Sequence, residues 1–267
     1  MIALDLMRKE FISLDQEETI GSLIGKIERN DECAAIIVSK GKYIGIINKM
    51  DFAKPRIDTQ KTKIKKFLSH SAVLNGNEDL KEIARLMYAS NSRILPVIKN
   101  SKPVGIIKIE DLIDNIKEYI DCKAEEIMSR QVKTINPDEK IGKAMELMRN
   151  EKISRLPVVE NDKVLGIITL RDLIEKYSSW SYKKGRGVKT TYPTSKTRAF
   201  KGEKIRVDSY PVKDEMSANI ICSEPDVNIK NIIDIMIDNN ISSVIILKKG
   251  KLSGIITFRD ILKKFIE

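Results

Sequence analysis

Two short motifs in this sequence could hold a polar ligand, because each places a threonine three residues before an aspartate. The pairs are Thr169 with Asp172 and Thr257 with Asp260. An apolar run ends at each threonine and a helical pattern follows, so each pair is predicted at a strand-to-helix turn, where both side chains can point into one cleft. There a carboxylate could accept hydrogen bonds from sugar hydroxyls. The threonine hydroxyl and the N–H groups that open the helix could donate to a phosphate.

Arginines next to these pairs would add positive charge. Arg171 and Arg259 directly precede the two aspartates. Arg155 lies two residues before Pro157, and its planar fork of donors could match phosphate oxygens. A simpler interpretation stays open for each pair, since the aspartate could merely cap its own helix and the threonine could merely satisfy the end of a strand. The recurrence of Thr-Arg-Asp in the same frame favours ligand contact.

The two pairs belong to an apolar motif that occurs four times along the chain. Each copy reads Gly-Ile-Ile, three further residues and an aspartate, and the copies begin at Gly45, Gly105, Gly166 and Gly254. An internal repeat indicates one supersecondary unit per copy, which must pack on its neighbours. The spacing between the last two glycines is longer than the others, so an insertion is expected there.

The third copy shows the predicted elements of the unit. Apolar residues at Ile141, Ala144, Met145 and Met148 follow the spacing of one helix face. Asn161-Asp162 between two apolar runs predicts a turn. A lead-in helix, a strand, a helix, two strands and a second helix are expected over 124–128, 132–135, 141–148, 156–159, 164–168 and 171–174. The other copies fit the same β-α-β-β-α order.

This unit, closed by a glycine, two apolar residues, a threonine or serine and an aspartate, resembles the cystathionine-β-synthase (CBS) domain. The resemblance covers nearly the whole chain outside 52–63 and 178–211. It implies an α+β fold of four β-α-β-β-α CBS repeats packed as two pseudo-symmetric pairs, copies one with two and three with four. Such a chain is similar to the γ regulatory subunit of AMP-activated protein kinase and to stand-alone archaeal four-CBS proteins. The repeats and the crossover insertion between the last two are expected at 1–58, 59–121, 122–177, 178–211 and 212–267.

The resemblance also implies a function, because clefts between paired CBS repeats commonly bind AMP, ADP, ATP or S-adenosylmethionine. Main-chain groups of the first strands would hold adenine. Ligand contacts in the second pair are expected from Thr134, Ile135, Arg155, Pro157, Thr169, Arg171, Asp172, Cys222, Ser223, Thr257, Arg259 and Asp260. We therefore expect a regulatory sensor without a cofactor, in which the ligand favours one packing of the repeats and so alters a protein partner or a second copy.

The first pair departs from the family pattern. Copy one has Asn48 in place of the threonine and no arginine before a proline. Copy two has Lys108 at the threonine position, and this lysine could meet a phosphate or could fill an empty cleft with charge. A weaker ligand set is expected there, namely Asp51, Arg93, Lys108 and Asp111. Copy four reads Ser242-Ser243 where copy three has its arginine, so its cleft lacks one phosphate ligand.

The insertion 178–211 combines lysines and arginines with interleaved aromatic residues. Such a segment could grip single-stranded nucleic acid by charge and stacking, which makes a nucleic-acid-associated protein the alternative function. A solvated linker, a crossover loop packed by its aromatic residues, and a partner-docking loop compete with that hypothesis. We favour the packed crossover or the partner contact.

Composition narrows the classes of protein further. Forty-eight Lys and Arg against 38 Asp and Glu give a net charge of +10, which favours anionic partners or reflects the charge-rich surfaces of thermophiles. Three cysteines without short spacing and a single histidine predict neither a disulfide framework nor a metal site. With no nucleophile–base pair or Walker-type loop, a non-catalytic protein is expected, one that could regulate an enzyme on another chain. The lack of a long apolar run or a signal peptide predicts a cytoplasmic protein without a membrane span.

Overall fold

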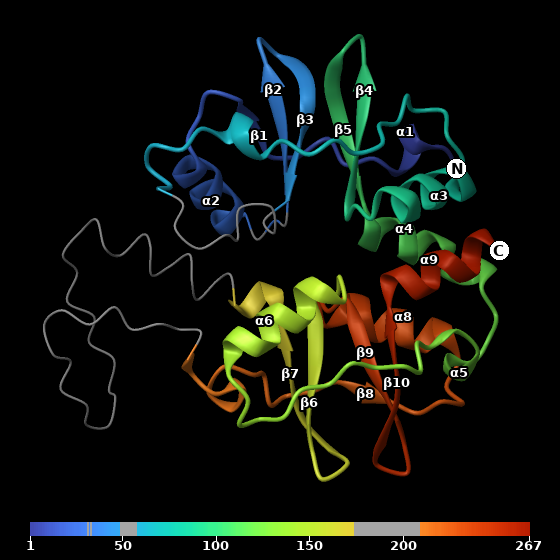
Figure 1. Ribbon diagram of the computed structural model, residues 1–267. Helices are drawn as coiled ribbons and strands as arrows, with labels where there is room; N and C mark the ends of the chain where they lie inside the picture. The colour runs from blue at the N-terminus through green and yellow to red at the C-terminus, as the bar shows by residue number, and fades with distance from the viewer. Residues whose placement is uncertain (31, 33, 49–57, 174–208) are drawn as a thin grey trace, which may run out of the picture. The chain divides into compact units, whose positions relative to one another are not determined.

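Figure 1 shows the computed structural model, which describes residues 1–30, 32, 34–48, 58–173 and 209–267. These residues form two compact units. The first unit, Met1–Val132 with Ile221–Glu267, contains the bodies of copies one, two and four. The second unit, Lys133–Ile220, contains the body of copy three. Within the described part of the chain, no helix combines the length and apolar character needed to cross a membrane.

In the first unit, each repeat packs helices on a small sheet. Copy one comprises β1 (Ser13–Asp15), α2 (Ile20–Arg29), β2 (Ala34–Ser39) and β3 (Lys42–Asn48). Copy two comprises α3 (Leu80–Ser90), β4 (Ile94–Lys99), β5 (Lys102–Lys108), α4 (Ile109–Ile116) and the 3-10 turn η2 (Lys117–Tyr119). Copy four comprises β8 (Cys222–Ser223), α8 (Ile229–Asp238), β9 (Ser243–Lys248), β10 (Lys251–Thr257) and α9 (Phe258–Ile266).

The second unit repeats the pattern with α6 (Ile141–Asn150), β6 (Arg155–Glu160) and β7 (Lys163–Thr169). Ile141, Ala144 and Met148 are buried, as the helical spacing predicts, and pack with Leu156, Val158 and Ile168 of the hairpin. The strand predicted over 132–135 is reduced to one parallel bridge between Ile135 and Val158. Residues 170–173 are helical.

Two-residue loops close the central hairpin of every repeat. Both loop residues have positive φ in each case: 49° and 65° at Asn161 and Asp162, and 53° and 76° at Lys249 and Gly250. Such loops match the right-handed twist of the flanking strands and hold them in register. The returning strand therefore delivers residue 169, or its counterpart, to the same end of the sheet in every copy.

The sheets of copies one and two pack against each other. Ala34, Ile36 and Ile46 of copy one form one buried cluster with Ile94 and Ile106 of copy two. Because alternate residues of a strand face opposite sides, Ile37 and Ile47 of the same hairpin pack instead on helix α2. This apolar cluster joins copies one and two as a pair.

The segment that leads into each repeat packs on the body of a different repeat. In the first unit, α1 (Ala3–Leu6) lies on copy two, η1 (Ile64–Phe67) on copy one and α5 (Ala124–Ile127) on copy four. In the second unit, η4 (Val212–Asp214) lies on copy three. Backbone bridges fix all four segments: Arg8 with Ile106, Ser69 with Ile46, Ser129 with Ile255 and Ser217 with Ile167.

This docking explains the glycine that opens every motif. A Cβ atom at Gly105 would lie 2.8 Å from the carbonyl oxygen of Arg8, and one at Gly166 would lie 2.7 Å from that of Ser217. Neither distance is possible for a real side chain, so the returning strand needs glycine where the lead-in segment crosses it. The motif glycine is therefore required by the close approach of two backbone segments and not by a turn.

Copies two and four meet through their helices inside the first unit, where α3 and α4 lie beside α9 and α4 contacts α8 (Figure 1). Ile113 and Ile116 of α4 share one buried core with Ile232, Ile261 and Leu262 of copy four. Lys117 donates to Asp234 at 2.8 Å, and Lys230 donates to Glu118 at the same distance. A largely apolar contact with a charged rim thus joins these two repeats.

Candidate functional site

The two threonine–aspartate pairs form the same hydrogen-bonded cap. In the second unit, Oδ2 of Asp172 accepts from the backbone N–H of Thr169 at 3.0 Å and from its hydroxyl at 2.7 Å. The N–H of Asp172 donates back to the threonine Oγ1 at 3.2 Å. In copy four, Oδ2 of Asp260 accepts from the N–H and hydroxyl of Thr257 at 2.8 and 2.6 Å. Both aspartates thus accept from the threonine that precedes the helix, and in the second unit the threonine hydroxyl also accepts in return.

The cap orients the carboxylate at the helix start and engages only one of its two oxygens. Only Oδ2 of each aspartate takes part in the cap. Oδ1 of Asp260 accepts one hydrogen bond, from the Ser129 hydroxyl at 3.0 Å. Since each carboxylate oxygen has two lone pairs, the Oδ1 atoms can accept further hydrogen bonds beside the open N–H groups of a helix start. Each aspartate therefore does cap its helix, and this capping is compatible with ligand contact.

Copy three places an arginine directly beside its threonine. The antiparallel register pairs Arg155 with Thr169, so the two side chains leave the same face of the sheet. Arg155 is half-buried, and its Nη2 donates to Ser154 Oγ at 3.3 Å. Of the other residues predicted in this copy, Ile135 and Pro157 are buried in the sheet region, while Thr134 and Arg171 are exposed. The structure thus brings Arg155, Thr169 and Asp172 together.

Copy four has no arginine at this position, and the arginine of its motif, Arg259, contacts copy two. Its register pairs Ser243 with Thr257, and Cys222 and Ser223 form the edge strand that pairs with β9. The guanidinium carbon of Arg259 lies 4.0 Å from the centre of the Tyr88 ring. Its Nη1 donates to the Tyr88 carbonyl at 3.0 Å and to Asn91 Oδ1 at 3.1 Å. Arg259, predicted to contact a ligand, thus binds helix α3 of copy two in this structure.

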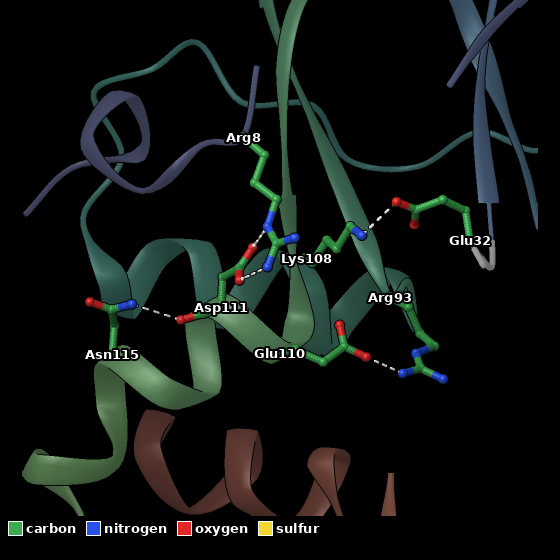
Figure 2. A network of polar contacts seen from close by, with 7 residues as sticks. All are labelled: Arg8, Glu32, Arg93, Lys108, Glu110, Asp111 and Asn115. Carbon is green, nitrogen blue, oxygen red and sulfur yellow. Dashed lines mark hydrogen bonds and ion pairs between the residues drawn. The ribbon is translucent and has the colours of Figure 1, made fainter. Parts of the chain in front are cut away.

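In copy two the corresponding charged residues are paired with one another (Figure 2). Arg8 Nε and Nη2 donate to the two carboxylate oxygens of Asp111 at 2.6 and 2.5 Å. Lys108 Nζ donates to Glu32 Oε1 at 2.6 Å, and the two side chains are only 19% and 18% exposed. The hydrogen bond to Asp111 raises the pKa of Arg8 above its ordinary value, although burial opposes the shift.

A hollow of about 400 Å³ lies beside these ion pairs and is lined by Arg8, Lys9, Glu10, Glu32 and Lys108. A further ion pair joins Arg93 and Glu110, and the Arg93 guanidinium lies 6.0 Å from the centre of the Phe258 ring. The structure therefore gathers the predicted residues Arg93, Lys108 and Asp111 in one region, each with a partner from the chain itself. Asp51 and residues 178–208 of the insertion lie outside the described residues, so these predictions remain untested.

Sequence reasoning missed Arg8, Glu32 and Glu110. A signal for Arg8 exists in the four lead-in segments, which read Leu68-Ser69, Met128-Ser129, Met216-Ser217 and Met7-Arg8. Only the segment that packs on copy two has an arginine where the other three segments have a serine. Glu32 gives no such signal, because it follows helix α2 of copy one and meets Lys108 only through the packing of the two sheets.

The fold, the four lead-in segments and the capped aspartates together define a class of protein. The family model described as the CBS domain matches residues 2–56, 64–118, 124–179 and 212–267, and the chain belongs to this family. CBS-domain proteins are regulatory and often bind adenosine-containing ligands.

Two individual proteins show in more detail what this chain is similar to. Protein MJ1404 of Methanocaldococcus jannaschii is 28% identical over 269 residues, which cover 97% of this chain and 60% of that protein. The chain thus spans 60% of that relative's length, which is less than two thirds. The crystal structure of MJ1225 from the same organism, described as a proposed archaeal homologue of γ-AMPK, superposes with a TM-score of 0.83. That alignment covers 99% of this chain and 100% of MJ1225 at 19% identity, so it shows a shared fold.

CBS repeats also occur inside enzymes. Inosine-5'-monophosphate dehydrogenase of M. jannaschii is 32% identical over 144 residues, which cover 53% of this chain but only 23% of the enzyme. The likeness therefore concerns a part of that enzyme.

Proposed function

We propose that this chain is a cytoplasmic regulatory sensor that binds AMP, ADP, ATP or S-adenosylmethionine at the capped aspartates of copies three and four. The observation that carries the proposal is the same pair of hydrogen bonds, from the threonine N–H and hydroxyl to Oδ2 of the aspartate, at Thr169–Asp172 and Thr257–Asp260. Two sites built alike in separate units, each with an oriented carboxylate at a helix start, favour a shared ligand over two unrelated helix caps.

The expected contacts follow from the chemistry of the site. Each Oδ1 accepts from ribose hydroxyls, while the helix-start N–H groups face the phosphate or another anionic part of the ligand. Arg155 adds a bidentate donor in copy three. Because Ser243 takes the equivalent position in copy four, that copy binds phosphate more weakly.

A regulatory effect requires that the ligand prefer one arrangement of the repeats. Asp260 lies at the start of α9, and α9 packs on α3 and α4 of copy two. A ligand held by Asp260 therefore acts on the helix that joins copies two and four. The responding partner is a regulated protein or a second copy of this chain, and the chain itself acts without catalysis or a cofactor.

Isothermal titration of the full chain with AMP, ADP, ATP and S-adenosylmethionine tests this proposal. Binding of at least one ligand is expected. Asp172→Asn and Asp260→Asn should each weaken binding at their own site about tenfold or more, since each variant loses charge-assisted hydrogen bonds. Asp238→Asn removes the same charge from the exposed end of α8 and serves as the matched control, with unchanged affinity. Absence of heat with all four ligands, or equal losses in Asp238→Asn, would contradict the proposal.

A further inference from the structure

We propose that Arg8 occupies the ribose-binding position of the copy-two cleft, so that the chain itself closes this cleft and directs ligand to the other copies. The inference rests on the proposed function, because it assigns the copy-two cleft a role opposite to that of copies three and four. Arg8 is then a specificity-determining residue, although it lies about a hundred residues from Asp111 in the sequence.

Backbone geometry establishes which residues are equivalent. Arg8 exchanges two backbone hydrogen bonds with Ile106, at 2.8 and 3.0 Å. Ser129 exchanges the same pair with Ile255, at 3.0 and 3.1 Å. The remaining two copies repeat the arrangement through Ser69 with Ile46 and Ser217 with Ile167. Four equivalent positions therefore face the four motif strands, and three of them are serine.

The side chain at this position meets the motif aspartate. In copy four, the Ser129 hydroxyl gives one hydrogen bond to Asp260 Oδ1 and leaves the cap untouched. In copy two, Arg8 takes both oxygens of Asp111. The guanidinium places two ionised N–H donors on the two carboxylate oxygens at once. Ribose hydroxyls would have to displace this ion pair to reach the carboxylate of Asp111.

A second change in the same copy acts in the same direction. Lys108 replaces the threonine, and the cap of α4 has no side-chain hydrogen bond from it. Asp111 thus lacks the threonine hydroxyl that donates to Asp172 and Asp260, and both of its carboxylate oxygens accept from Arg8 (Figure 2). Both the missing threonine and the added arginine change the hydrogen bonds of the same carboxylate, that of Asp111.

Two further cations of the cleft are also engaged by carboxylates of the chain itself. Lys108 is paired with Glu32 and Arg93 with Glu110. The adjoining hollow is lined by Arg8, Lys9 and Lys108 as well as by the carboxylates of Glu10 and Glu32. A phosphate that bound Arg8 or Lys108 would have to break their existing ion pairs. Arg8, Lys108 and Arg93 of the copy-two cleft are therefore each engaged by a carboxylate of the chain itself.

Restoring the pattern of the other copies tests this inference. Arg8→Ser and Lys108→Thr, combined in the full chain, recreate the serine and threonine found around Asp260. Native mass spectrometry with AMP, ATP and S-adenosylmethionine in separate titrations should show one further molecule bound per chain with at least one of them. Adding Asp111→Asn should weaken that added site about tenfold or more.

An unchanged stoichiometry with all three probes, or an added site that ignores Asp111→Asn, would overturn the inference. Arg8→Ser alone gives the same test if the double variant loses its circular dichroism spectrum, because the Arg8 side chain is 51% exposed. The two proposals separate cleanly. The function fails if the wild-type chain binds no adenosine ligand, whereas the role of Arg8 fails if the Asp111-dependent site is not gained.

Discussion

At the scale of single residues, the same carboxylate serves the fold and can serve a ligand. Asp172 and Asp260 hold a helix start with one oxygen and present the other. Asp111 stands at the same place in the motif but is held by Arg8. The difference arises from two neighbouring positions, the lead-in residue and the threonine position, rather than from the aspartate itself.

Glu78 is a second carboxylate whose surroundings allow a prediction. Its oxygens accept from the N–H groups of Asn75 and Gly76 at 2.7 and 2.9 Å, and its carbonyl receives the N–H of Ala3. Burial alone would raise the pKa of Glu78, but the backbone hydrogen bonds outweigh it and lower the pKa below 4.5. The stabilisation from Glu78 is thus present above its unfolded pKa and is lost as the pH falls through its folded pKa.

Glu78→Gln should therefore lower the free energy of unfolding by about 1–3 kcal/mol at neutral pH. The difference between variant and wild type should shrink as the pH falls below 4.5, the ordinary value for this carboxyl. Urea unfolding at a series of pH values measures both effects. A loss of stability that stays constant down to acid pH would show that the carboxylate charge is not responsible.

At the scale of elements, the docking of lead-in segments decides what stands beside each motif. Gly105 permits the crossing of Met7 and Arg8, because a Cβ atom there would lie 2.7 Å from the Met7 sulfur and 2.8 Å from the Arg8 carbonyl. Gly105→Ala should destabilise the chain by about 1–3 kcal/mol, since the obstruction is partly backbone.

Gly25 provides a matched control in helix α2. A Cβ atom there meets nothing closer than an arginine nitrogen at 3.9 Å. Gly25→Ala should stabilise the chain by about 0.5–1 kcal/mol, because alanine lowers the entropy cost of the helix. Thermal unfolding of the two variants should shift in opposite directions, and a shift in the same direction would refute the crossing as the reason for Gly105.

The helices and strands could be predicted from the sequence, whereas the docking of each lead-in segment on a different repeat could not. The apolar spacing of residues 141–148 and the Asn161-Asp162 turn correspond to α6 and the β6–β7 hairpin. These signals are local, so they survive without tertiary information. The pair of Arg8 with Asp111 joins residues far apart in the sequence and exists only because α1 docks on copy two. Similarly, Arg259 carries no sequence sign that it stacks on Tyr88.

At the scale of the whole molecule, copy four is tied to copy two through helices, and copy two to copy one through sheets. Arg259 adds to the helical contact by stacking on Tyr88 and bonding Asn91. Arg259→Ala should lower the free energy of unfolding by about 0.5–1 kcal/mol, as expected for an exposed cation–π contact. Arg259→Lys should recover part of the loss, because an ammonium keeps the charge but not the planar fork. Equal stability of Arg259→Ala and wild type would show that the stacking contributes nothing.

The contact between copies two and four also offers the proposed sensor a way to transmit the effect of ligand binding. The residue next to Arg259 is Asp260, whose Oδ1 receives the Ser129 hydroxyl of the lead-in segment that follows copy two. A ligand at Asp260 must therefore adjust contacts to both α9 and this segment. In the proposed account, the copy-two cleft, where Arg8 holds Asp111, takes no ligand of its own.

Mass spectrometry of small molecules released from the purified and then denatured chain tests the central claim most directly. The wild-type chain is expected to release an adenosine-containing compound, and the Asp172→Asn/Asp260→Asn variant is expected to release far less of it. Release of equal amounts from both chains, or of no adenosine compound from the wild type, would contradict the account.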